Sequence, residues 1–296
     1  MAGAIERAAA RGVRIRFAYN VDHRNPIPVP PPPEPDVQLI ATLPVDGKAV
    51  AGVPDLMHHK YVVRDGTSVW TGSMNWTDDS FTRQENVVVT VDTPAVAAAF
   101  TQDFEQLWSR DEVEDTGLVE PTWYDGVRAW FTPGHGEDLS HRIAQAIGHA
   151  RRRVRICSPV ITTAPVLGTL AQVISEGRLD VAGCVDRTQI GGVVYQWRQN
   201  GNVSWKLPLL ERVMAGPFTG KISTAWRPEG SLHDFMHAKV TVADDTVFVG
   251  SFNLSRSGEM NAENVLEIED AQAADELARF VDGVRVLYPP VRLEAN

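Results

Sequence analysis

Histidine and lysine occur twice in the same HxK spacing, as His58 and Lys60 and again as His237 and Lys239. In an extended segment, residues i and i+2 point to the same face, so each pair can reach one ligand. An imidazole transfers protons or attacks as a nucleophile near neutral pH, and an ammonium neutralises anionic oxygens. Two such pairs facing each other suit one phosphodiester, with an imidazole on each side of the phosphorus for in-line attack and departure.

The residues that follow each HxK pair also repeat, which indicates an internal duplication. HxK and the next aspartate repeat at an offset of 179 residues, and the later positions repeat at 178, so the second copy has lost one residue. The matched pairs are Asp65 with Asp244, Gly72 with Gly250, Ser73 with Ser251, Asn75 with Asn253, and Glu85 with Glu263.

These residue types complement the HxK pairs. The glycine lets backbone approach closely, and the serine hydroxyl and asparagine amide add neutral donors beside each lysine. The attacking imidazole must be neutral while the other is charged, and the apparent pKa values of such a pair belong to both rings together. A carboxylate would orient each ring, and Glu85 and Glu263 are the candidates.

The elements that must position these residues are strands alternating with helices. Each HxK is expected in a strand that turns at the aspartate into a second strand ending at GSxN. An apolar run and an amphipathic helical stretch follow, over 94–110 and 271–288. This pattern predicts α/β layers with mainly central sheets in two halves, residues 1–120 and 121–296.

The two halves differ at their beginnings. The second half has an additional helical stretch over 138–150 and a strand from Val154, and the first half shows no counterpart. We therefore expect the first half to lack about one βα unit, which a partner chain or a second copy could complete. The proline-rich segment 25–35 is expected to be an extended polyproline loop.

Composition narrows the class of protein. Formal net charge is −10 over 296 residues, which argues against a protein that coats nucleic acid. No apolar run is long enough to span a membrane, and two cysteines in apolar runs fit a reducing cytoplasm. Neither metal-site Cys/His spacing nor a glycine-rich nucleotide loop is present, so we expect no metal and no cofactor.

The motifs resemble the signature of the phospholipase D superfamily, which is HxK, four residues, Asp, then GSxN. The first copy matches it in full, and the second has a spacer one residue shorter. The resemblance runs from about residue 4 to residue 288. It implies two α/β/α halves with mixed sheets, related by a pseudo-twofold axis, and a site at their interface.

The resemblance also implies roles. His58 would form a phosphohistidine without a metal, and His237 would protonate the leaving alcohol and later deprotonate water or an acceptor alcohol. The orienting acids would cross the interface, Glu263 behind His58 and Glu85 behind His237. The phosphate would be held by Lys60, Ser73, Asn75, Lys239, Ser251 and Asn253, while Asp65, Gly72, Asp244 and Gly250 would be structural.

Three functions agree with this interpretation. A phosphodiesterase or phosphatidyltransferase acting on phospholipid comes first, and a metal-independent nuclease of the same superfamily comes second because of the acidic charge. The third is a non-catalytic binding or scaffold protein with the same fold. Loss of either HxK would have favoured the third function, and both are intact.

Overall fold

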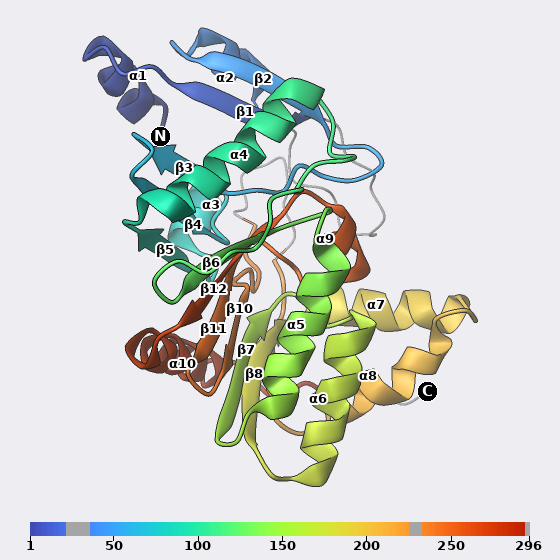
Figure 1. Ribbon diagram of the computed structural model, residues 1–296. Helices are drawn as coiled ribbons and strands as arrows, with labels where there is room; N and C mark the ends of the chain where they lie inside the picture. The colour runs from blue at the N-terminus through green and yellow to red at the C-terminus, as the bar shows by residue number, and fades with distance from the viewer. Residues whose placement is uncertain (22–35, 225–232, 294–296) are drawn as a thin grey trace.

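The computed structural model describes residues 1–21, 36–224 and 233–293, so the proline-rich segment predicted over 25–35 lies outside the described residues. Figure 1 shows the N-terminal half, in blue to green, above the C-terminal half. Both halves are α/β layers, as predicted from the sequence. No helix in the described ranges is long and apolar enough to cross a membrane.

The C-terminal half is built on a seven-stranded mixed sheet of order β6-β12-β11-β10-β7-β8-β9. Strands β7, β8 and β9 are parallel, and the other neighbours are antiparallel. The strands are β6 (Val127–Phe131), β7 (Arg153–Ser158), β8 (Asp180–Asp186), β9 (Phe218–Lys221), β10 (Val240–Ala243), β11 (Thr246–Gly250) and β12 (Asn264–Glu269).

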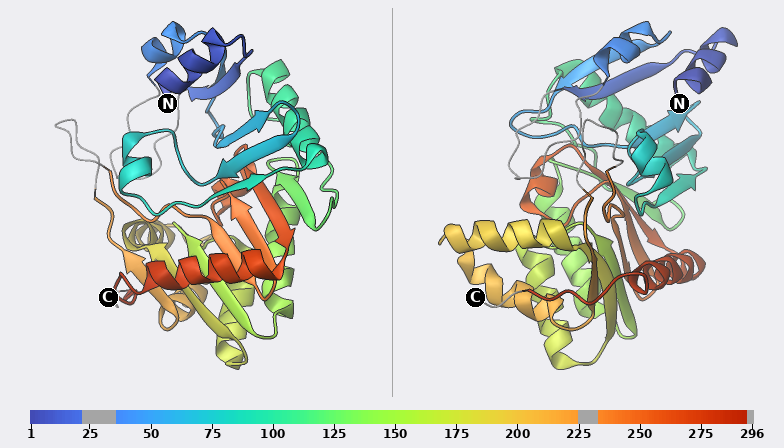
Figure 2. Two further views of the ribbon diagram at one scale, coloured as in Figure 1. Left: turned by 90° about the vertical axis from the view of Figure 1, so that its left-hand side faces the viewer. Right: turned by 180° about the vertical axis from the view of Figure 1, so that it is seen from behind.

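Helices cover both faces of this sheet (Figure 2). Along β11 the apolar side chains alternate: Phe248 packs into the core beneath α5 (Gly136–His149) and α6 (Ala164–Glu176), while Val247 and Val249 pack into the core beneath α10 (Ala271–Arg285). This period of two is what a strand buried on both faces requires. The helices are α5 (Gly136–His149), α6 (Ala164–Glu176), α7 (Arg187–Gln199), the 3-10 helix Ser204–Lys206, α8 (Leu207–Met214), α9 (Arg256–Met260) and α10 (Ala271–Arg285).

The N-terminal half carries two smaller sheets. A parallel pair joins β1 (Arg16–Val21) to β2 (Asp46–Ala51), and an antiparallel sheet joins β3 (Tyr61–Arg64), β4 (Ser68–Gly72) and β5 (Val88–Val91). Its helices are α1 (Ala2–Ala10), α2 (Val37–Thr42), α3 (Asp78–Thr82) and α4 (Pro94–Arg110).

The strands of the N-terminal half form two separate sheets, whereas their counterparts in the C-terminal half form one. Strands β3, β4 and β5 correspond to β10, β11 and β12, and β1 and β2 correspond to β8 and β9. In the C-terminal half β7 joins the two groups, but no strand within the described residues lies between β3 and β1. Val62 of β3 is 38% exposed, whereas Thr241 at the matching place in β10 is 3% exposed, because α5 packs on β10. Within the described residues the N-terminal half has no counterpart of α5 and β7, the βα unit that it is predicted to lack.

The halves meet through a shared core and through backbone pairing. Phe100 of α4 packs edge to face on Phe131 of β6, with ring centroids 4.9 Å apart. The segment around each HxK pairs with the other half: Met57 bridges to Ala262, and Glu85 bridges to Met236. The HxK residues therefore lie just before β3 and β10, not within them as predicted, because these segments leave their own sheets to bond across the interface.

Candidate active site

The two motif histidines meet at the interface between the halves. The rings of His58 and His237 lie edge to face, with centroids 6.5 Å apart and an interplanar angle of 88°. Each histidine is held by a backbone hydrogen bond to the other half. His58 N–H donates to the Ala262 carbonyl at 2.9 Å, and His237 N–H donates to the Glu85 carbonyl at 3.2 Å. The duplication thus brings two imidazoles to one place.

His58 has a carboxylate partner from the other half. Its Nδ1 lies 2.8 Å from both carboxylate oxygens of Glu263, which is fully buried. With Nδ1–H donated to this carboxylate, Nε2 keeps its lone pair. The predicted contact of Glu263 with His58 across the interface is confirmed.

The predicted contact of Glu85 with His237 is wrong. Nδ1 of His237 lies 3.1 Å from the side-chain oxygen of Asn86. The Glu85 carboxylate instead accepts hydrogen bonds from Lys221, at 2.8 Å, and from the hydroxyl of Tyr288.

The reason is that the two copies differ by one residue in the spacing between the GSxN serine and the strand that it pairs with, which the sequence alignment does not show. The backbone N–H of Ser73 bonds to the carbonyl of Val87, whereas that of Ser251 bonds to the carbonyl of Asn264. Structural equivalence therefore pairs Asn86 with Glu263, and the second copy has lost another residue beyond its GSxN. The repeated letters ENV in both copies make the sequences align one residue out of register.

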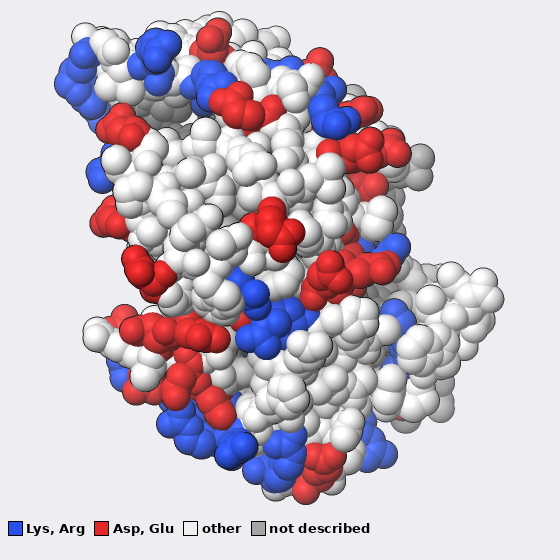
Figure 3. Space-filling model, in the orientation of Figure 1, with Lys and Arg blue, Asp and Glu red and all other residues white. Residues whose placement is uncertain are grey.

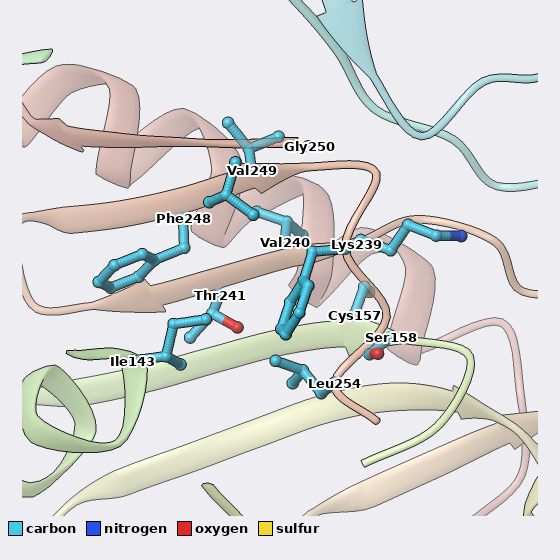
Figure 4. A pocket seen from close by; sticks show the side chains of 12 residues that line it. Ile143, Cys157, Ser158, Lys239, Val240, Thr241, Phe248, Val249, Gly250 and Leu254 are labelled. Atoms are coloured by element: carbon cyan, nitrogen blue, oxygen red, sulfur yellow. The ribbon is translucent and has the colours of Figure 1, made fainter. Parts of the chain in front are cut away.

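The motif lysines are buried and symmetrically placed. Lys60 Nζ donates to the carbonyl of His58 at 2.5 Å, and Lys239 Nζ donates to the carbonyl of His237 at 2.7 Å. Figure 4 shows the Lys239 amine pointing away from the apolar side chains that line the neighbouring cavity. Burial lowers the pKa of Lys60 to about 8, and burial with the charge of Lys60 lowers the pKa of Lys239 well below its usual value.

Glu263 is the carboxylate that contacts one of the site histidines, and two lysines lie beside it. Burial lowers the pKa of His58 to about 4 despite the opposing effect of Glu263, and burial with the charges of the two lysines lowers the pKa of His237. Burial opposes ionisation of Glu263, but His58 and Lys60 outweigh it, so the pKa of that carboxyl is lower than usual. One carboxylate beside two buried lysines leaves a cationic environment that suits an anionic ligand.

Both motif serines are fully buried and bond within the protein, so their predicted contact with phosphate stays a prediction. The Ser73 hydroxyl donates to the Asn86 side-chain oxygen at 2.8 Å and accepts the N–H of Val87 at 2.9 Å. The Ser251 hydroxyl accepts the N–H of Asn264 at 3.0 Å. Each serine therefore braces the strand end that carries Asn86 or Glu263.

The motif asparagines are half-buried. The buried Oδ1 of Asn253 has no hydrogen-bond partner within the described residues. Such an atom is commonly satisfied by a bound ligand or water. Binding of phosphate by Asn75 and Asn253 stays a prediction.

The motif aspartates and glycines form the framework. Asp65 and Asp244 have φ of 53° and 52° in the hairpin turns, and the Asp244 carboxylate accepts the backbone N–H groups of residues 151, 152 and 153. A side chain at Gly72 or Gly250 would place Cβ 2.1 or 2.0 Å from a carbonyl oxygen of the neighbouring strand. At both glycines the backbones of neighbouring strands are in van der Waals contact, which leaves no room for a side chain.

The fold and the paired HxK sites define a phospholipase D-like protein. A family model described as "Cardiolipin synthase, PLD-like domain" matches residues 1–108 and 143–284, so the chain belongs to this family. The solved phosphatidylserine synthase of Haemophilus influenzae has the same fold: TM-score 0.53 and 12% identity, covering 78% of this chain and 61% of that one.

Two curated proteins show shorter similarity. The mitochondrial cardiolipin hydrolase of Xenopus laevis is 49% identical over 53 residues, which is 18% of this chain and 25% of that protein. The protein of the same name from Mus musculus is 32% identical over 108 residues, which is 36% of this chain and 44% of that protein. The matches span less than half the length of either relative.

Proposed function

We propose that the protein is a phosphodiesterase of the phospholipase D type that works through a phosphohistidine. The observation that carries the proposal is the meeting of His58 and His237 across the interface, with Glu263 behind the first ring and Lys60 and Lys239 buried beside them. A strongly desolvated group of titratable side chains with this complementarity to an anion is typical of catalytic sites.

The proposed reaction has two steps. Nε2 of His58 forms a bond to phosphorus while the bond from phosphorus to the leaving oxygen breaks, and the imidazolium of His237 gives that oxygen its proton. Water then attacks phosphorus, loses its proton to His237, and releases His58. Lys60 and Lys239 neutralise the non-bridging oxygens throughout, and we propose that no metal takes part.

Phospholipid is the substrate class that we propose first. It is supported by the description of the family model and by the cardiolipin hydrolases that match parts of the chain. A nuclease needs a basic track for the strand. On the face in Figure 3, basic and acidic side chains are interspersed around broad uncharged areas and form no such track.

Incubation with three substrates in EDTA tests the proposal: vesicles containing cardiolipin, single-stranded DNA and a bis-phosphodiester reporter. We expect turnover of the vesicles without added metal, and acid-labile, base-stable phosphate on the protein. His58→Ala should abolish both. Turnover that depends on added divalent metal, or a fully active His58→Ala variant, would contradict the mechanism.

Two further proposals concern the surroundings of the protein. Within the described residues no strand joins β1 to β3, and this supports completion of the N-terminal sheet by a helix followed by a strand, from a partner chain or another copy. Light scattering of the purified protein, alone and at raised concentration, tests self-association.

The buried free thiols of Cys157 and Cys184 support the proposal that the protein works in the reducing cytoplasm, and localisation of a tagged chain tests it.

A further inference from the structure

The two site histidines have chemically different partners at equivalent positions of the duplicated fold. Nδ1 of His58 faces the carboxylate of Glu263 at 2.8 Å, and Nδ1 of His237 faces the amide oxygen of Asn86 at 3.1 Å. Asn86 lies between α3 and β5, and Glu263 lies between α9 and β12. The Ser73 hydroxyl donates to the side chain of Asn86, and the Ser251 hydroxyl accepts the N–H of Asn264, the residue after Glu263. The halves therefore differ by a charge at one position.

Within the described residues, no hydrogen bond or ion pair joins a carboxylate to the ring of His237. The nearest acid in sequence to its partner is Glu85, whose carboxylate is bound by Lys221 and Tyr288. Phe235 packs on the His237 ring, with centroids 4.7 Å apart. Four charged groups have the largest effects on the pKa of the ring and all lower it, namely Lys239 and His233 from its own half and Lys60 and His58 from the other.

We propose, resting on the function proposed above, that Asn86 is a positioning residue that makes His237 the proton donor and leaves the nucleophilic role to His58. An amide oxygen that accepts Nδ1–H fixes the tautomer and ring orientation but stabilises a ring cation less than a carboxylate does. The His237 imidazolium is therefore the stronger acid. His58 becomes cationic when Nε2 bonds to phosphorus, and Glu263 stabilises that charge.

Asn86→Asp tests the inference, because it gives His237 the carboxylate that His58 already has. We expect the pKa of His237, followed by NMR of labelled histidine without substrate, to rise by about 1–2 units. The alkaline limb of the plot of activity against pH should move to higher pH by a similar amount. Asn202→Asp makes the same change on an exposed loop after α7, so it should change neither the pKa of His237 nor the alkaline limb.

Asn86 also donates to the Ser80 carbonyl at 3.2 Å, so Asn86→Asp loses one hydrogen bond. The reciprocal variant Glu263→Gln keeps the test informative if the first variant folds poorly: it should lower the pKa of His58 and reduce the yield of phosphorylated protein at least tenfold. A His237 pKa that stays unchanged in Asn86→Asp, or an unchanged phosphoprotein yield in Glu263→Gln, would overturn the inference. Absence of turnover by the unaltered protein would instead overturn the proposed function.

Discussion

Nδ1 of His58 and the carboxylate of Glu263 lie 2.8 Å apart although they belong to different halves of the duplicated chain. Each half of the molecule therefore contains only part of a working site. One half contributes the ring that would attack phosphorus, and the other contributes the acid that orients it. This sharing explains why the reacting groups depend on the packing of the halves as much as on their own hairpins.

Removal of either site histidine should abolish turnover while leaving the fold intact. We expect His58→Ala and His237→Ala to lower kcat/KM by about a thousandfold or more, since each removes a group that takes part in bond making or proton transfer. His58→Ala should also prevent labelling of the protein by phosphate. His141→Ala, on the exposed side of α5, is the matched control and should retain full activity.

Acid should weaken the fold over a defined window. Burial lowers the pKa of His58 from 6.5 to about 4, so between these values the unfolded chain binds more protons than the folded one. This contribution to stability is fully present above pH 6.5, falls as the pH decreases, and is lost by about pH 4. Urea unfolding at pH 7 and pH 5 should differ by about 1–2 kcal/mol from this group. His58→Gln cannot titrate and should show a smaller difference, and an equal one would contradict this origin.

The two motif aspartates should differ in their contribution to stability. Asp244 accepts three backbone N–H groups at the start of β7, at 2.7, 2.9 and 3.0 Å, so Asp244→Ala should destabilise the protein by about 2–3 kcal/mol. Asp65 occupies the same turn of the N-terminal half, with the same left-handed φ, but within the described residues no strand equivalent to β7 lies next to β3. Asp65→Ala should therefore cost less than half as much in thermal or urea unfolding. Equal costs would show that the turn itself, and not the neighbouring strand, makes the aspartate necessary.

The sequence predicts much of this site because a duplication makes the pattern visible twice. The paired HxK and GSxN motifs and the additional βα unit of the C-terminal half can be predicted from the sequence. The structure brings the two HxK histidines together, and its described residues contain no counterpart of α5 and β7 in the N-terminal half. The partner of His237 does not follow, because a residue's place in the chain does not determine its hydrogen-bond register across an interface. Glu85 and Asn86 are adjacent letters, and only the pairing of Ser73 with Val87 determines which of them faces the ring. Burial of the serines is likewise a property of packing that spacing does not express.

The glycine of GSxN should tolerate no side chain, for a reason separate from chemistry. Cβ at position 250 would lie 2.0 Å from the carbonyl oxygen of Asn264, and that oxygen is fixed because it accepts the N–H of Ser251. The clash cannot be relieved by rotating a side chain, so β11 and β12 would have to separate beside Glu263. We expect Gly250→Ala to cost about 3 kcal/mol or more and to lower activity with it. Gly168→Ala, in α6 with no atom within 4 Å of the added carbon, should instead stabilise the protein by up to about 1 kcal/mol. Chemical denaturation of both variants measures the contrast, and a Gly250→Ala protein as stable as the parent would refute the close approach of the two strands.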